Sequence, residues 1–367
     1  MNSKKETKIK EENKRKPLKV IHSSTPLRIN DIGGWTDTWF SGEGKVLNFA
    51  VAPRVEVRIQ VFSNIKKRPE RVLVRAKNYG DTFRLNPEKH HYDQHPLLQG
   101  AINSMAIPQN LEIEISLRSP IPVGSSTGTS ASVCVALLGA LDFLTLQKHS
   151  RDEIVTLAHR VETDKLEQQS GIQDQICAAY GGICFIHMYS YPQSHVSKLE
   201  LEENVREELD RRLCLIYLGK AHSSSALHEE VIATLERKGS QFGMIRKLRN
   251  LAQQAQQTLL KGDLAALGEV MIQNNECQRA LHSQLISEEA DSVIEIAKKY
   301  KAAGWKVNGA GGKGGSLTIL GSEENSMIAK MIEDINLLRK GIKHLPISLS
   351  KTGLKVWEEG ETKKDFS

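Results

Sequence analysis

The chain has 367 residues, of which 39% are hydrophobic, and a chain of this size can bury a large core, most simply as two lobes that share a cleft. The formal net charge is +6, but residues 1–20 hold eight Lys or Arg against three Glu, so +5 of it lies near the N-terminus. We predict a disordered basic tail over residues 1–17 and a nearly neutral folded part, which argues against nucleic acid as a partner.

Five scattered cysteines without a C-x-x-C pair indicate neither a disulfide framework nor a zinc site. The N-terminus is charged rather than apolar, and no apolar run reaches the length of a membrane span. We therefore expect a cytoplasmic protein with no membrane partner.

The N-terminal part of the chain predicts a sheet. Residues 19–28 are typical of a strand that enters a loop, and Gly33-Gly34 marks a turn in that loop. The following strands are predicted from alternating or clustered β-forming residues, over 45–51, 55–61, 71–75 and 111–117.

The stretch Pro120–Ser132 is rich in Gly, Ser and Thr and runs directly into the apolar segment 133–144. This pattern predicts a helix start with unpaired backbone N–H groups, where the macrodipole favours an anion such as phosphate. Gly124 and Gly128 permit close approach of a ligand, and Thr129 and Ser130 offer hydroxyl groups. The alternative is an ordinary buried helix capped by Ser or Thr.

The remaining segments predict a mixture of helices and strands that completes two lobes. After the helix that follows the glycine-rich stretch, residues 171–182 indicate a loop and a short helix that ends at a glycine pair. The other expected helices cover 152–168, 246–261, 263–281, 290–301 and 326–340, the longest region running from about 225 to 285. The expected strands cover 183–188, 213–218, 316–320 and a short segment around Ile347.

The glycine run Gly309–Gly315 does not fit the common nucleotide-binding motifs. A P-loop is excluded because Lys313 is followed by Gly314 rather than by Ser or Thr. The run satisfies G-x-G-x-x-G, but that fingerprint must open a helix, whereas a β-like segment follows here. A dehydrogenase therefore remains a weaker alternative function for this chain. If the glycine run has no binding role, it forms a tight turn between a helix and a strand.

Three motifs occur in the order Thr25–Asp37, Pro122–Ser132 and Val307–Leu317. With these motifs in this order, the chain resembles the GHMP (galacto-, homoserine, mevalonate and phosphomevalonate) kinase superfamily. The resemblance implies an α+β fold with two lobes: a lobe similar to ribosomal protein S5 domain 2, over residues 18–205, which binds ATP, and a ferredoxin-like lobe over 206–367. It also implies ATP and Mg²⁺ as cofactors.

Within the superfamily, Gly33–Asp37, Val46–Asn48 and Gln173–Gln175 resemble the branch that phosphorylates the anomeric hydroxyl of sugars. Leu281–Ser287 is more similar to the D-glycero-D-manno-heptose 7-phosphate kinases, and Trp35 to the L-fucose kinases. The resemblance thus implies a sugar 1-kinase, in first place for heptose 7-phosphate, with an L-fucose-type kinase or a non-catalytic sugar and ATP sensor as alternatives. We also consider a homodimer as an expectation for this chain.

The resemblance also implies a role for individual residues. Asp174 matches the aspartate that orients or deprotonates the acceptor hydroxyl, with Arg28 as the cation that stabilises developing charge. A turn aspartate and a surface cation are the alternatives. Glu162 stands about where the family has its carboxylate metal ligand, with Glu167 as the alternative and a solvated helix face as the structural explanation for either. The other implied site residues are the substrate-binding Gly34, Asp37, Gly311 and Gly312, the ATP-binding Gly124, Ser125, Ser126, Gly128, Thr129, Ser130 and Ala131, and the metal-binding Ser130.

Some residues depart from the family pattern. Ser126 and Thr127 stand where the second motif usually has Gly and Leu, and Lys313 interrupts a run that is usually all glycine. An extra cation at Lys313 could contact a phosphate. His222 stands where related sugar kinases usually carry an arginine, which weakens the transfer of a substrate-phosphate role to it.

Overall fold

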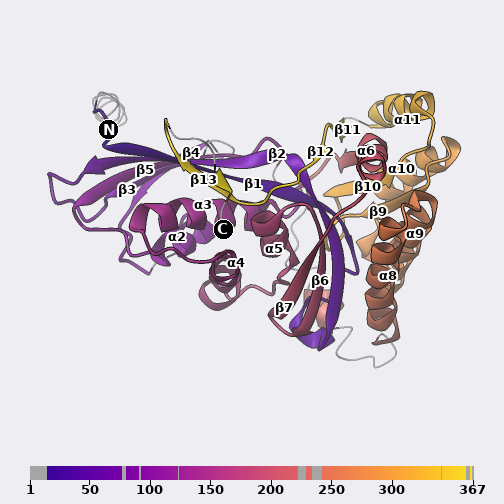
Figure 1. The fold of residues 1–367 in the computed structure, drawn as a ribbon, viewed down its shortest axis with the longest axis horizontal. Helices are drawn as coiled ribbons and strands as arrows, with labels where there is room; N and C mark the ends of the chain where they lie inside the picture. Colours follow the sequence, from indigo (N-terminus) through magenta and orange to yellow (C-terminus); the bar gives the residue numbers. More distant parts are fainter. Residues whose placement is uncertain are drawn as a thin grey trace.

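The computed structural model describes residues 15–76, 80–90, 92–122, 124–221, 229–233, 242–339, 341–360 and 364–365. Most of the predicted basic tail and His222 lie outside the described residues. The molecule is elongated, with a large sheet at one end of its long axis and a smaller sheet at the other (Figure 1).

The larger sheet has ten strands. The two longest are β1 (Lys19–Ile32) and β2 (Gly44–Ser63). Its main path runs β14-β13-β1-β2-β5-β3-β4, while β12 and β6 pair with further stretches of β2, and β7 pairs with β6. All pairings are antiparallel except that of β3 with β5. The other strands are β3 (Val72–Ala76), β4 (Asp81–Leu85), β5 (Leu111–Arg118), β6 (Ile183–Ser190), β7 (Gln193–Leu199), β12 (Ser348–Leu349), β13 (Lys355–Glu358) and β14 (Lys364–Asp365).

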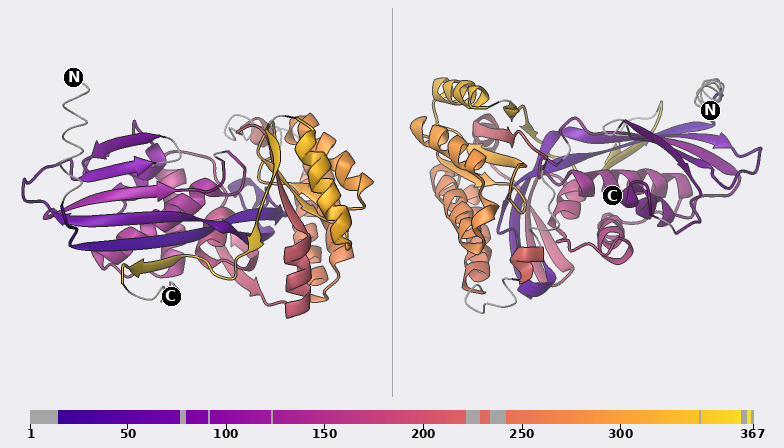
Figure 2. Two further views of the ribbon diagram at one scale, coloured as in Figure 1. Left: turned by 90° about the horizontal axis from the view of Figure 1, so that it is seen from above. Right: turned by 180° about the vertical axis from the view of Figure 1, so that it is seen from behind.

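Helices cover one face of this sheet, as Figures 1 and 2 show. Along β2, the valine and isoleucine side chains of 55–61 are buried and alternate with more exposed polar ones, so the helices cover a regular apolar face. The central helix α3 (Thr129–Thr145) is buried along most of its length and lies between this face and its neighbours. The covering helices are α2 (Pro96–Asn103), α3, α4 (Arg151–Arg160) and α5 (Gln173–Tyr180).

The smaller sheet has four antiparallel strands in the order β11-β8-β10-β9. Its apolar side chains form a second core with α10 and α11. Helices α8 and α9 pack on each other and connect the two sheets, because α8 contacts β2 and α9 contacts β9. The elements are α6 (Glu203–Arg212), β8 (Leu213–Leu218), α8 (Phe242–Leu260), α9 (Leu264–Leu281), α10 (Glu288–Lys299), β9 (Gly304–Val307), β10 (Ser316–Leu320), α11 (Asn325–Leu337) and β11 (Ile342–Leu345).

Two expectations about the elements need correction. Segments 45–51 and 55–61 form one strand, and Pro53 is accommodated because the register against β1 shifts between Thr25 and Leu27. The helix expected over 152–168 ends as α-helix at Arg160 and continues as one π-helical turn, Val161–Lys165. The chain end returns to the larger sheet through β12, β13 and β14, which the division at residue 205 does not anticipate, and the division itself stays a prediction.

Helix α9 approaches β9 through glycine. A Cβ added to Gly268 would collide with the backbone carbonyl of Ala303, and one added to Gly304 would collide with the backbone of Gly268. We therefore expect Gly268→Ala to lower the free energy of unfolding by about 1–3 kcal/mol, measured by denaturant unfolding. Gly243→Ala is the matched control, because none of the residues that the structure describes lies within 4 Å of its added Cβ. Equal unfolding midpoints for Gly268→Ala and wild type would contradict this account of the packing.

Candidate active site

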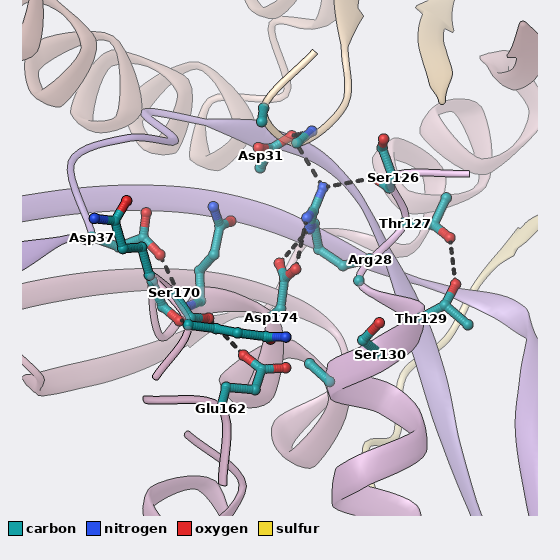
Figure 3. A pocket seen from close by; sticks show the side chains of 18 of the residues that line it. Arg28, Asp31, Asp37, Ser126, Thr127, Thr129, Ser130, Glu162, Ser170 and Asp174 are labelled. Carbon is teal, nitrogen blue, oxygen red and sulfur yellow. Dashed lines mark hydrogen bonds and ion pairs between the residues drawn. The ribbon is translucent and has the colours of Figure 1, made fainter. Parts of the chain in front are cut away.

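A cavity of about 580 Å³ lies where the three glycine-containing motifs meet (Figure 3). Its lining comes from β1 and the turn after it, from the start of α3, from the segment between α4 and α5, and from the turn after β9. The lining includes Arg28, Asp31, Asp37, Gly124 to Ala131, Glu162, Glu167, Asp174 and Gly309. Residues far apart in the sequence thus share one cavity.

The start of α3 has the features of an anion-binding site, which we call the anion seat and which comprises residues 124–131. Its N-cap is Gly128, in the left-handed region at φ 64°, and among the described residues no side chain caps the first turn. Gly124 and Ser126 also have positive φ, at 74° and 55°. Ser126 therefore occupies a conformation that favours glycine, the residue expected at this position from the resemblance.

Arg28 and Asp174 form a two-point ion pair in the cavity wall. Arg28 Nε donates to Asp174 Oδ1 at 2.7 Å, and Nη2 donates to Oδ2 at 2.9 Å. The guanidinium is 5% exposed, whereas the Asp174 side chain is 29% exposed, so a ligand in the cavity can reach the carboxylate. Although burial opposes it, the carboxylates of Asp174 and Asp31 raise the pKa of Arg28, which keeps this cation charged.

Gly128 brings the anion seat against this ion pair. A Cβ at this position would lie 3.2 Å from Asp174 Cγ and 3.4 Å from Arg28 Cβ. The absence of a side chain therefore lets the first turn of α3 and the Arg28–Asp174 pair form one continuous wall.

Glu162 lies on the π-helical turn and is 7% exposed. Ser170 Oγ and Gln175 Nε2 both donate to its Oε2, at 2.6 Å and 2.7 Å. Burial raises the pKa of Glu162 to about 7. Figure 3 shows its carboxylate and the Ser130 hydroxyl on neighbouring walls of the cavity, close to Asp174.

These residues fit a magnesium ion that is bound together with a nucleotide. The described residues contain no group of three or more His, Cys, Asp or Glu that could hold a metal alone. Mg²⁺ is commonly held by one or two protein oxygens and the substrate phosphates. The two hydrogen bonds to Oε2 orient Glu162 and leave Oε1 for a cation, while bound positive charge would favour the ionised carboxylate.

Asp37 is buried behind the turn that follows β1. Its Oδ2 accepts the backbone N–H of Gln173 at 3.2 Å, and a Cβ added to Gly171 would collide with the same oxygen. Burial raises the pKa of Asp37 to about 6. The contact with Gln173 therefore holds the Asp37 carboxylate next to Asp174, which lies in the first turn of α5. Both carboxylates line the cavity, where a ligand with hydroxyl groups can reach them.

Buried amide side chains that the sequence did not single out hold the motif loops together. Asn274 Oδ1 accepts the N–H of Gly33 at 2.8 Å, and Gln278 Nε2 donates to the carbonyl of Gly309 at 3.0 Å. Asn308 Nδ2 donates to Ser316 Oγ, which donates to the carbonyl of Ser125. Polar residues at i and i+4 on the buried face of α9 are the signal that could have identified Asn274 and Gln278.

The predicted site residues are not all placed in the cavity. All of the predicted ATP-binding and metal-binding residues line it, and so do Arg28, Asp37, Asp174 and the alternative Glu167. Gly34 lies against Asp31, and Gly311 and Gly312 contact Leu285, so these three are outside the lining formed by the described residues. Lys313 is exposed and is also outside it.

Two comparisons with known proteins bear on the family of this chain. Residues 96–182 match the family model for the GHMP kinases N terminal domain. A mevalonate kinase of Thermococcus gammatolerans is 30% identical over 67% of this chain and 69% of that protein. The chain belongs to the GHMP kinase family. It is therefore a kinase, and the family supports ATP as its phosphoryl donor, generally with Mg²⁺.

Other GHMP kinases match over most of this chain. A D-glycero-alpha-D-manno-heptose 7-phosphate kinase of Campylobacter jejuni is 22% identical over 93% of this chain and 99% of that protein. An L-fucokinase/L-fucose-1-P guanylyltransferase of Bacteroides fragilis is 22% identical over 92% of this chain but 38% of that protein. The crystal structure of Lactococcus lactis galactokinase has a TM-score of 0.75 at 18% identity, covering 96% of this chain and 99% of that one. The expected two-lobed α+β fold is thus confirmed.

None of the helices in the described part of this GHMP kinase is long and apolar enough to cross a membrane.

Proposed function

We propose that this GHMP kinase transfers the γ-phosphoryl group of ATP to the anomeric hydroxyl of a sugar, giving a sugar 1-phosphate and ADP. The observation that carries the proposal is the Arg28–Asp174 pair, which lines the same cavity as the uncapped first turn of α3. D-glycero-D-manno-heptose 7-phosphate is the first acceptor to test, because the full-length relative from C. jejuni is named for it. L-fucose is the alternative, from the B. fragilis relative.

The nucleotide would bind with its phosphates at residues 124–131 and its base in a second cavity of about 260 Å³. This second cavity shares Gly124, Thr129, Ser130 and Gln168 with the first, and its other lining is largely apolar. The apolar residues are Ala76, Pro96, Leu97, Leu98, Leu117, Val133 and Leu166. A largely apolar cavity next to the first turn of α3 suits a nucleobase followed by a phosphate chain.

Asp174 would orient the acceptor hydroxyl and accept its proton as the hydroxyl oxygen bonds to the γ-phosphorus and the bond to the ADP oxygen breaks. Arg28 fixes the plane of the Asp174 carboxylate through two hydrogen bonds and supplies positive charge beside the reacting oxygens. Glu162 and Ser130 would hold Mg²⁺, which when bound offsets charge on the phosphates. Positioning and charge therefore do most of the work in the proposed reaction.

Asp37 would accept hydrogen bonds from other hydroxyl groups of the sugar. Its pKa of about 6 means that the carboxylate is protonated below pH 6 and ionised above it, and the ionised form accepts more hydroxyl hydrogen bonds. We expect the KM for the sugar to fall as the pH rises through about 6, and Asp37→Asn to remove this step. The KM for ATP, measured in the same assays, is the control and should follow pH equally in both proteins. A step of the same size in the variant would exclude Asp37 as its source.

A coupled assay of ADP release over a panel of acceptors tests the function. The panel contains D-glycero-D-manno-heptose 7-phosphate, L-fucose, galactose and mevalonate, since relatives are named for each of these chemistries. Turnover with a sugar, and a product whose phosphate sits on the anomeric carbon by ³¹P NMR, supports the proposal. Turnover with mevalonate alone contradicts it, and binding of ATP and sugar without turnover supports the sensor alternative.

The cytoplasmic location and the homodimer stay predictions.

A further inference from the structure

Four buried or half-buried charges of alternating sign run from the smaller sheet to the cavity: Lys306, Asp31, Arg28 and Asp174. Lys306 Nζ donates to Asp31 Oδ1 at 2.8 Å, Arg28 Nη1 lies 3.3 Å from the same oxygen, and Asp174 holds the other side of Arg28. We propose, on the basis of the proposed kinase function, that Asp31 and Lys306 are positioning residues, which fix Arg28 from the side opposite Asp174.

The burial of these groups indicates a built arrangement rather than a surface ion pair. The side chains of Lys306, Asp31 and Arg28 are 0%, 2% and 5% exposed. Burial lowers the pKa of Lys306, whereas the charges of Lys306 and Arg28 lower that of Asp31 although burial opposes them. A buried charge is tolerated only with a partner, so each member of this series depends on the next.

Asp31 Oδ1 is the point at which two hydrogen bonds and an ion pair meet. Besides the hydrogen bond from Lys306 and the ion pair with Arg28, the backbone N–H of Gly309 donates to it at 3.1 Å, which ties the third glycine motif to the same carboxylate. Figure 3 shows Arg28 between Asp31 on one side and Asp174 on the other. With Nη1 directed to Asp31 and to the carbonyl of Ser126, and Nε and Nη2 directed to Asp174, the guanidinium plane is fixed.

Lys306 gives the smaller sheet a part in this arrangement. It lies on β9, whereas Asp31 and Arg28 lie on β1 of the larger sheet. Its Nζ also donates to the carbonyl of Val307 at 2.8 Å, which anchors the ammonium group. By neutralising Asp31, Lys306 leaves the charge of Arg28 available to Asp174 and to the reacting phosphate, so the geometry of the reacting pair depends on how β9 docks on β1.

The test compares Lys306→Met, Asp31→Asn and the double variant in full-length protein, with kcat, KM and denaturant unfolding measured for each. We expect each single variant to lower kcat by about tenfold or more, with the KM for ATP nearly unchanged, and to unfold at lower denaturant concentration. In the double variant both buried charges are removed, so the unfolding midpoint should recover while kcat stays low. Lys299→Met, which removes an exposed lysine paired with Asp334, is the matched control and should leave kcat, KM and the unfolding midpoint unchanged.

The double variant separates positioning from a purely structural role, even if the single variants fold poorly. Recovery of kcat together with stability would overturn the proposal, and so would a single variant with wild-type kcat. Failure of the proposed function has a different signature, because wild-type protein would then show no turnover with any sugar. In that case, the function and the positioning role that rests on it are rejected together.

Discussion

Replacing Asp174 by asparagine is expected to lower kcat by about 10²–10⁴-fold while the affinity for ATP changes little. The amide has nearly the shape of the carboxylate, so the start of α5 and the contact with Gly128 should persist. It cannot accept a proton from the acceptor hydroxyl, however, and it offers Arg28 one oxygen where the carboxylate offers two. The rate constants come from the ADP-release assay, and the ATP affinity from calorimetry on the same protein.

Asp164→Asn is the matched control for this variant. Asp164 lies on the preceding π-helical turn, pairs with Arg160 at 3.0 Å, and is 55% exposed, so its loss should leave kcat at the wild-type value. If Asp174→Asn kept kcat within a few-fold of wild type, the carboxylate would be neither base nor orienting group, and the proposed mechanism would fail. If Asp174→Asn lost both turnover and ATP binding, the substitution would have damaged the cavity as a whole.

The start of α3 could be predicted from the sequence because neighbouring residues determine where a helix begins. Gly, Ser and Thr immediately before a long apolar segment predict a helix start with unpaired N–H groups, and α3 begins at Thr129 with Gly128 as its N-cap. The pairing of Arg28 with Asp174 is different, since 146 residues separate them. No periodicity spans that distance, so only the resemblance to a family could bring the two residues together.

Other features depend on tertiary contacts that have no local signal. The sequence around Lys306 gives no sign of its burial, because the charged partner Asp31 lies 275 residues earlier in the chain. The π-helical turn at Glu162 was also hidden, because the helical pattern continues through it in the sequence. Such turns are frequent at functional sites, since one extra residue redirects a side chain without ending the helix.

Substitution of the proposed metal ligand Glu162, for which Glu167 is the alternative, is expected to have the second large effect on activity. We expect Glu162→Gln to lower kcat/KM for ATP in the presence of Mg²⁺ by about 10²-fold, and to raise the Mg²⁺ concentration needed for half-maximal rate. The reason is that Ser170 and Gln175 hold Glu162 through one oxygen, in the cavity that Ser130 also lines, and an amide there offers a weaker ligand without charge.

Glu167→Gln makes the same substitution in the same cavity and therefore serves as the control. Glu167 lines the cavity two residues beyond the end of the π-helical turn, in a left-handed conformation with φ 52°. Because glutamine keeps the size of the side chain, any difference between the two variants reports on charge. If Glu167→Gln shows the Mg²⁺-dependent loss and Glu162→Gln does not, the assignment is reversed. If neither shows it, Mg²⁺ is held at this site by the nucleotide and Ser130 without a carboxylate, and the raised pKa of Glu162 reflects burial alone.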